Sequence, residues 1–162
     1  MGESYGVRLA KAEHVFSAAH FITYEGHCER LHGHNYRVAA EVFGELDENH
    51  YVVDFIALRD TLKAIVDELD HHMILPTEHS TIHVATAGHE VEVRFEDRRW
   101  VFPRNDCVLL PVANTTTELI ARHIGRRLLA DLEDRTGARP SLLKVEVDDC
   151  YGQVATVELR DE

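Results

Sequence analysis

Three histidines near the start of the sequence have the types and spacing needed to bind a metal. His32 and His34 are separated by one residue, so on a β-strand both side chains point to the same face. His20 ends the apolar segment 16–20, which predicts a neighbouring strand that brings a third imidazole to the same point. Three protein ligands leave one position open, as in catalytic zinc sites, and imidazoles without thiolates favour zinc over metals that prefer softer ligands. We therefore predict a Zn²⁺ site at His20, His32 and His34.

Cys28 precedes the His-x-His pair by four residues, in the loop 23–31. Functional residues commonly lie on loops between rigid strands. A thiol near a dication and histidines ionises more readily than a free thiol, and the thiolate is then a base or nucleophile. The spacing also allows a fourth metal ligand that closes the site, or a loop residue without a role.

Asp70 and His71 end a predicted helix, and Glu118 begins another. An Asp–His pair can orient the imidazole and raise its basicity, but histidines are also favoured at an ordinary solvated helix end by the helix dipole. On spacing alone, the solvated end is the better interpretation. Glu118 likewise fits a capping box with Thr115, which explains it more economically than a ligand contact.

Four strands and two helices must position these residues. Asp54 is a good N-cap for a helix at 55–69 that has apolar residues at helical spacing, and a second helix begins near Thr116 and ends before Gly137. The segment 81–110 between the helices is expected to be extra β-structure. The four strands are predicted at 7–16, 36–44, 143–147 and 154–159.

This order predicts an α+β fold in which an antiparallel sheet carries two helices on one face. The length of 162 residues and the hydrophobic content of 44% suit a single domain, 1–162, with a β-rich insert at about 78–110. A small sheet leaves exposed edges, and joining sheets between subunits would remove them.

Composition excludes several classes of partner. The formal net charge of −12 argues against a nucleic acid bound through its phosphates. A membrane span is not expected, because the sequence contains no run of 18 apolar residues. Three cysteines, an odd number, without a secretory signal favour a reducing compartment, and we expect a cytoplasmic protein.

Taken together, these segments resemble the 6-pyruvoyl-tetrahydropterin synthase / 6-carboxytetrahydropterin synthase family. The matching segments are FSAAH at 16–20, EGHCERLHGHNY at 25–36, GELD at 44–47, VDF at 53–55, LDHH at 69–72 and NTTTE at 114–118. The resemblance implies a tunnelling (T-) fold, in which sheets of several subunits join into a barrel, and a homohexamer. It also implies zinc on the three histidines and a proton-transfer set of Cys28, Asp70 and His71, which reverses the preference for a solvated helix end.

The Cys-x3-His-x-His spacing resembles the 6-carboxytetrahydropterin branch of the family. That branch implies conversion of 7,8-dihydroneopterin triphosphate to 6-carboxy-5,6,7,8-tetrahydropterin, acetaldehyde and triphosphate, in 7-deazaguanine (queuosine) biosynthesis. The alternatives are 6-pyruvoyl-tetrahydropterin synthesis, a related pterin side-chain lyase, or a non-catalytic T-fold protein that binds zinc or pterin.

Three residues are the candidates for binding the pterin substrate: Asp149, Glu118 and Thr116. Asp149 aligns with a family carboxylate that anchors the guanidine-like edge of the pterin ring. The sequence departs from the family pattern there, since that carboxylate is usually glutamate and aspartate is one methylene shorter. The insert is a second departure, and three interpretations stay open: it covers the pocket, extends the oligomer, or marks a paralogue with an altered substrate.

Overall fold

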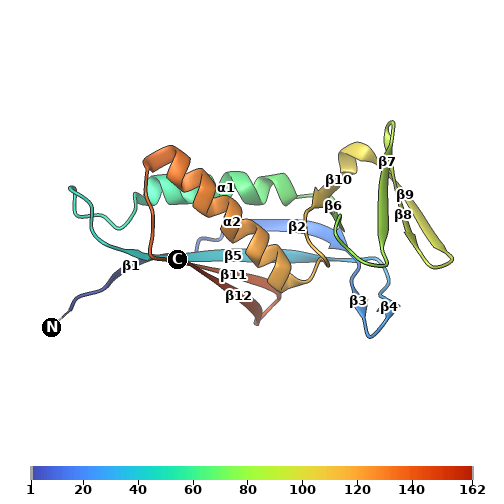
Figure 1. The fold of residues 1–162 in the computed structure, drawn as a ribbon, viewed down its shortest axis with the longest axis horizontal. Helices are drawn as coiled ribbons and strands as arrows, with labels where there is room; N and C mark the ends of the chain where they lie inside the picture. The colour runs from blue at the N-terminus through green and yellow to red at the C-terminus, as the bar shows by residue number, and fades with distance from the viewer. Residues whose placement is uncertain (1, 162) are drawn as a thin grey trace.

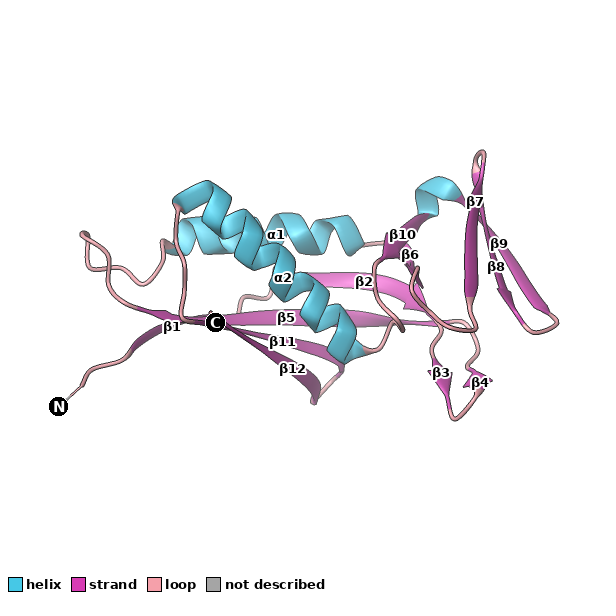
Figure 2. Cartoon of the chain, in the orientation of Figure 1, coloured by secondary structure: helices cyan, strands magenta, loops and turns pink. Residues whose placement is uncertain are grey.

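The computed structural model describes residues 2–161, in which two helices cover one face of a mixed β-sheet (Figures 1 and 2). The helices are α1 (Phe55–Leu69) and α2 (Thr117–Thr136), with a short 3-10 turn at Arg104–Asp106. The main sheet contains β1 (Tyr5–Leu9), β2 (Val15–His20), β5 (His32–Gly44), β6 (His72–Pro76), β10 (Cys107–Leu110), β11 (Leu142–Cys150) and β12 (Gln153–Arg160). A hairpin is formed by β3 (Thr23–Tyr24) and β4 (His27–Cys28), and a second sheet by β7 (His83–Ala87), β8 (Glu90–Phe95) and β9 (Arg98–Pro103).

The main sheet has the order β10-β6-β2-β5-β11-β12, with β1 also paired to β5. The expectation of an antiparallel sheet is correct for the pairs around β5 and for β11 with β12. It is wrong for β6, which runs parallel to both β2 and β10. Helix α1 runs back in the direction opposite to β5, and β6 continues in the direction of α1 (Figure 1). Because β2 is also antiparallel to β5, β6 is parallel to β2.

The predicted strand at 7–16 is two strands, because the chain turns between β1 and β2. The amide of His14 donates to the carbonyl of Lys11 (3.1 Å) in this turn. The two strands then pair with different halves of β5, since Leu9 lies opposite Ala40 whereas Val15 lies opposite Arg37. In contrast, β5 is longer than predicted and begins at His32.

The helices follow local signals to different extents. Asp54 caps α1 as predicted, accepting hydrogen bonds from the amides of Ile56 (2.7 Å) and Ala57 (3.4 Å). The capping box predicted for α2 is wrong: Thr116 is the N-cap and makes no side-chain capping bond, while the Thr115 hydroxyl donates to a carbonyl after β2. The left-handed Gly137 (φ 72°) ends α2 as expected.

Two apolar clusters hold these elements together. The larger lies between the helices and the sheet, and it includes alternate residues of β5 and β11 together with the buried stripes of α1 and α2. The smaller lies between the second sheet and the end of the main sheet, and consists of Phe21, Met73, Leu75, Ile82, Val91, Val93, Phe95 and Cys107. The segment 81–110 is therefore largely β-structure, as predicted, and lies beside the β3–β4 hairpin (Figure 1). None of the helices within residues 2–161 is long and apolar enough to cross a membrane.

Candidate active site

The three histidines predicted to bind a metal converge at one end of the main sheet. His20 on β2 lies directly opposite His32 on β5, and His34 lies opposite Ala18. All three therefore point to the sheet face that carries the helices. One ring nitrogen from each histidine can be chosen so that all three lie within 4.8 Å of one another. Strand pairing alone thus assembles three nitrogen ligands around one point.

Backbone carbonyls fix the orientation of two of these rings. His20 Nδ1 lies 2.9 Å from the carbonyl oxygen of Thr115, and His32 Nδ1 lies 2.8 Å from that of Arg30. A carbonyl only accepts, so each Nδ1 carries the proton and each Nε2 keeps a free lone pair. Burial lowers the pKa of His20 to about 4, which keeps this imidazole neutral at pH 7. A neutral imidazole with a free ring nitrogen is a ligand that Zn²⁺ binds well.

A cavity of about 590 Å³ opens next to the histidines. Among its lining residues is Asp149, whose Oδ2 accepts a hydrogen bond from the Thr117 hydroxyl (2.8 Å). Its Oδ1 is buried and has no hydrogen-bond partner among the described residues. Asp149 is left unpaired by an irregularity in the β11–β12 pairing, between Asp148 and Cys150. A buried oxygen of this kind needs a donor, and a ligand with N–H groups would supply it.

The cavity also includes both other residues predicted to contact substrate. Thr116 and Glu118 lie at the start of α2, and both line it. Glu118 is exposed and takes no part in a capping box, so its carboxylate is available to a ligand. The economical interpretation of Glu118 as a capping residue is therefore wrong.

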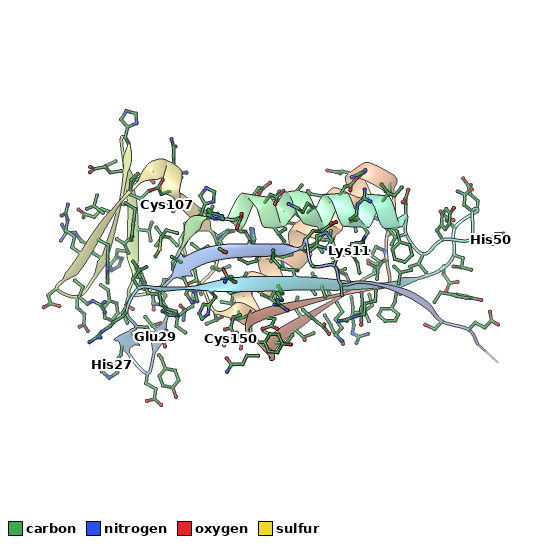
Figure 3. The ribbon with its side chains drawn as sticks, turned by 180° about the vertical axis from the view of Figure 1, so that it is seen from behind. Lys11, His27, Glu29, His50, Cys107 and Cys150 are labelled. Carbon is green, nitrogen blue, oxygen red and sulfur yellow. The ribbon has the colours of Figure 1, made fainter. Side chains whose placement is uncertain are left out.

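Cys28 does not line this cavity, but its neighbour Glu29 does. The Cys28 side chain is half-buried and packs against the smaller apolar cluster, where burial raises the pKa of the thiol. Figure 3 shows Glu29 at the base of the β3–β4 hairpin. Sequence reasoning missed Glu29, although the alternation of side chains along an extended chain could have indicated that Cys28 and its neighbour face opposite ways.

Asp70 and His71 form the predicted pair. Asp70 Oδ2 lies 2.8 Å from His71 Nδ1, and its Oδ1 accepts from the Ser17 amide (2.7 Å). The Ser17 amide and then the His71 imidazole lower the pKa of Asp70, so the carboxylate stays ionised. His71 is in the left-handed region (φ 58°), which is unusual for a residue other than glycine, and its side chain is 82% exposed.

This pair does not share the cavity that Asp149 lines. His71 lines a neighbouring cavity of about 500 Å³ together with Ser17 and Asn35, whose side chains point to the sheet face opposite the helices. His34 borders both cavities. Within one chain, the three histidines, Glu29 and Asp149 line one cavity, whereas the exposed His71 lines the neighbouring cavity, which it shares with His34.

Comparisons with known proteins show the family of this chain. The family model described as 6-pyruvoyl tetrahydropterin synthase matches residues 9–160. A Methanocaldococcus jannaschii protein described as a 6-carboxy-5,6,7,8-tetrahydropterin synthase is 29% identical over 86% of this chain and 86% of its own length. A Pyrococcus horikoshii protein with the same description is 32% identical over 82% of this chain and 78% of its own.

A solved structure shares the fold over nearly the whole chain. It is the 6-pyruvoyltetrahydropterin synthase of Plasmodium vivax, in a form in which a catalytic glutamate is replaced by alanine. This protein is 28% identical, with a TM-score of 0.90, and the match covers 99% of this chain and 100% of the other. The match extends across the segment 78–110, and two helices on a mixed sheet are the subunit fold that the two chains share. The chain belongs to the 6-pyruvoyl tetrahydropterin synthase family.

Proposed function

We propose that this protein is a zinc-dependent 6-carboxy-5,6,7,8-tetrahydropterin synthase. It converts 7,8-dihydroneopterin triphosphate to 6-carboxytetrahydropterin, acetaldehyde and triphosphate, in the pathway to 7-deazaguanines such as queuosine. The observation that carries the proposal is one cavity lined both by three histidines that could hold a metal ion and by a buried carboxylate oxygen that has no partner within residues 2–161. The descriptions of the relatives from M. jannaschii and P. horikoshii support the same reaction.

His20 and His32 would hold the zinc ion through their Nε2 atoms, together with one ring nitrogen of His34. When bound, zinc supplies a Lewis acid that stabilises negative charge developing on a hydroxyl oxygen of the substrate. The protein contributes the geometry of the site: the Thr115 and Arg30 carbonyls orient the rings, so little reorganisation is needed when the ligand set forms.

Asp149 would anchor the pterin ring. Its free Oδ1 accepts from the guanidine-like edge of the ring, while the Thr117 hydroxyl holds Oδ2 and fixes the carboxylate plane. Aspartate reaches less far than the glutamate usual in the family, so the ring would lie closer to β11. Glu118 and Thr116 line the same cavity and would contact the substrate around this anchor.

The acid–base groups would come from two copies of the chain. The Asp70 carboxylate fixes the proton on His71 Nδ1, which leaves Nε2 as an exposed base that faces away from its own Asp149 cavity. We propose that His71 completes the site of a neighbouring subunit in a homohexamer. Cys28 would move the proton on the other side of the substrate, after a rotation of its side chain out of the apolar cluster.

A related pterin side-chain lyase is the second candidate, and one observation favours it. Glu29, not Cys28, lines the histidine cavity, and the P. vivax relative has a catalytic glutamate. A carboxylate beside a metal-held hydroxyl is a competent general base. In this candidate Glu29, in place of Cys28, takes the proton from the substrate. A different bond of the pterin side chain then breaks.

Product analysis tests these proposals. The protein, loaded with one equivalent of Zn²⁺ per chain, is mixed with 7,8-dihydroneopterin triphosphate, and the pterins and small aldehydes are identified by mass spectrometry. We expect 6-carboxytetrahydropterin with acetaldehyde. A pyruvoyl product or a different cleaved pterin would replace the proposed reaction with a sibling activity. Substrate that binds and is returned unchanged would identify a non-catalytic T-fold protein.

A further inference from the structure

The peptide bond between Cys28 and Glu29 is held at both of its polar atoms. The carbonyl of Cys28 accepts a hydrogen bond from Arg98 Nη1 (2.7 Å), and the amide of Glu29 donates to the carbonyl of Ile22 (2.9 Å). With both groups bonded, rotation of this peptide plane would break a hydrogen bond on either side. The plane sets the directions in which the two flanking side chains leave the backbone, and these are the two candidate proton-transfer groups.

The hairpin that carries this peptide has little support of its own. Strands β3 and β4 contain two residues each, and the turn between them passes through Glu25 and Gly26, both with positive φ. Tyr24 in this hairpin is 65% exposed. An isolated two-stranded hairpin is at best marginally stable, so its geometry depends on contacts from outside.

Arg98 is itself held in place by aromatic packing. Its guanidinium carbon lies 4.6 Å from the centre of the Trp100 ring, two residues along β9. Trp100 in turn stacks on Phe21, with ring centres 4.6 Å apart, and Phe21 is fully buried next to His20. Strand β9 thus contacts Phe21, which directly follows the candidate ligand His20, and the carbonyl of Cys28, which directly precedes Glu29.

The other arginines of this sheet make a different kind of contact. Arg94 and Arg99 pair with Glu92, inside the second sheet, whereas Arg98 reaches a main-chain carbonyl outside it. We propose that Arg98 is a positioning residue, carried by the β7–β9 sheet, that fixes the Cys28–Glu29 peptide relative to the three histidines. This inference rests on the proposed function, since it gives the 78–110 segment a role in the same site.

The test compares R98A and R98K with the control R99A, which removes the same charge from the next residue of β9. Hydrogen exchange at the Glu29 amide, resolved by peptide mass spectrometry or NMR, reports on whether the Cys28–Glu29 peptide is held in place, and it does not require activity. We expect R98A to speed this exchange by at least about tenfold and R99A to leave it unchanged. We further expect R98A to lower kcat by about 10- to 100-fold with little change in KM, because misplacement of a reacting group lowers the rate more than it lowers substrate binding. R98K, which keeps a cationic donor, should recover part of kcat.

The outcomes separate this inference from the proposed function. Faster exchange and lower kcat in R98A alone would support Arg98 as the positioning residue. Unchanged exchange in R98A, or equal kcat in R98A and R99A, would overturn it even if wild-type protein makes the expected product. Zinc stoichiometry should remain at the wild-type value in all three variants, and its loss in R98A would assign Arg98 to general folding and overturn the inference. If wild-type protein converts no pterin, the proposed function is wrong, and so is the catalytic role of Arg98.

Discussion

Two backbone carbonyls decide which nitrogens of the histidine set face the cavity. The carbonyls of Thr115 and Arg30 accept hydrogen bonds from Nδ1–H of His20 and His32, so both rings present Nε2. The sequence indicated the three ligands through spacing alone, since a period of two and an adjacent strand are local patterns. It could not indicate the carbonyl partners, one of which lies 95 residues away from its histidine in the chain.

Replacing His32 tests the ligand assignment. His32 is exposed, so H32A opens no cavity in the core, and we expect the fold to persist while zinc is lost. Loss of an outer-shell partner alone typically lowers metal affinity by about 10- to 100-fold, so loss of a direct ligand should cost more. Zinc per chain and affinity are measured by competition with a chelator. The control is H27A, on the hairpin and outside the cavity lining, which should bind zinc as the wild type does. Full zinc occupancy in H32A would contradict the assignment of His32 as a ligand.

The choice between Cys28 and Glu29 is also a question about single side chains. For the carboxytetrahydropterin reaction, we expect C28A to keep zinc and lower turnover by about 10²–10⁴-fold, the usual contribution of a general acid or base. E29Q should lower it by much less. Steady-state rates with 7,8-dihydroneopterin triphosphate, at matched zinc loading, make the comparison. The reverse pattern would favour the lyase in which Glu29 is the base.

Among the helices and strands, the features that depend on local sequence were predicted, and those that depend on tertiary contacts were not. Helix α1 was predicted at its correct bounds because a cap and an apolar stripe are both local features. The start of α2 near Thr116 was also predicted correctly, but its capping box was not, because the Thr115 hydroxyl bonds the carbonyl of Phe21 and not its own helix end. The division of 7–16 into β1 and β2 was missed for the same reason: it depends on pairing with two halves of β5. Strand β6 was missed because it follows α1 within two residues, leaving no turn signal between them.

The cap of α1 gives a prediction for stability. Asp54 is exposed, and its side chain accepts from two amides at the helix start, so D54A removes the cap without disturbing the core. We expect D54A to lower the free energy of unfolding by about 1 kcal/mol and D54N to retain most of it, because asparagine is also a good N-cap. Denaturant unfolding of both variants measures the difference. Equal midpoints for D54A and wild type would show that the cap bonds contribute nothing net.

At the scale of the whole molecule, the sheet has one face covered by helices and one face open. The cavity lined by the three histidines and Asp149 lies on the covered side, whereas His71 lines a cavity with residues of the open side. The sequence placed Asp70 and His71 beside each other, but it contained no information on which cavity they border. The proposed mechanism therefore requires His71 to act in the site of another subunit.

Mixing two inactive variants tests whether His71 acts in the site of another subunit. C28A and H71A are each expected to lose turnover, and His71 is exposed enough that its replacement should not disturb the fold. The two are co-expressed with different affinity tags, and mixed oligomers are isolated through both tags and assayed with 7,8-dihydroneopterin triphosphate. If each site combines residues of two subunits, random mixing gives about a quarter of the sites both intact side chains, and activity returns to about that fraction. Mixed oligomers that stay inactive, while wild-type protein treated identically is active, would contradict the shared site.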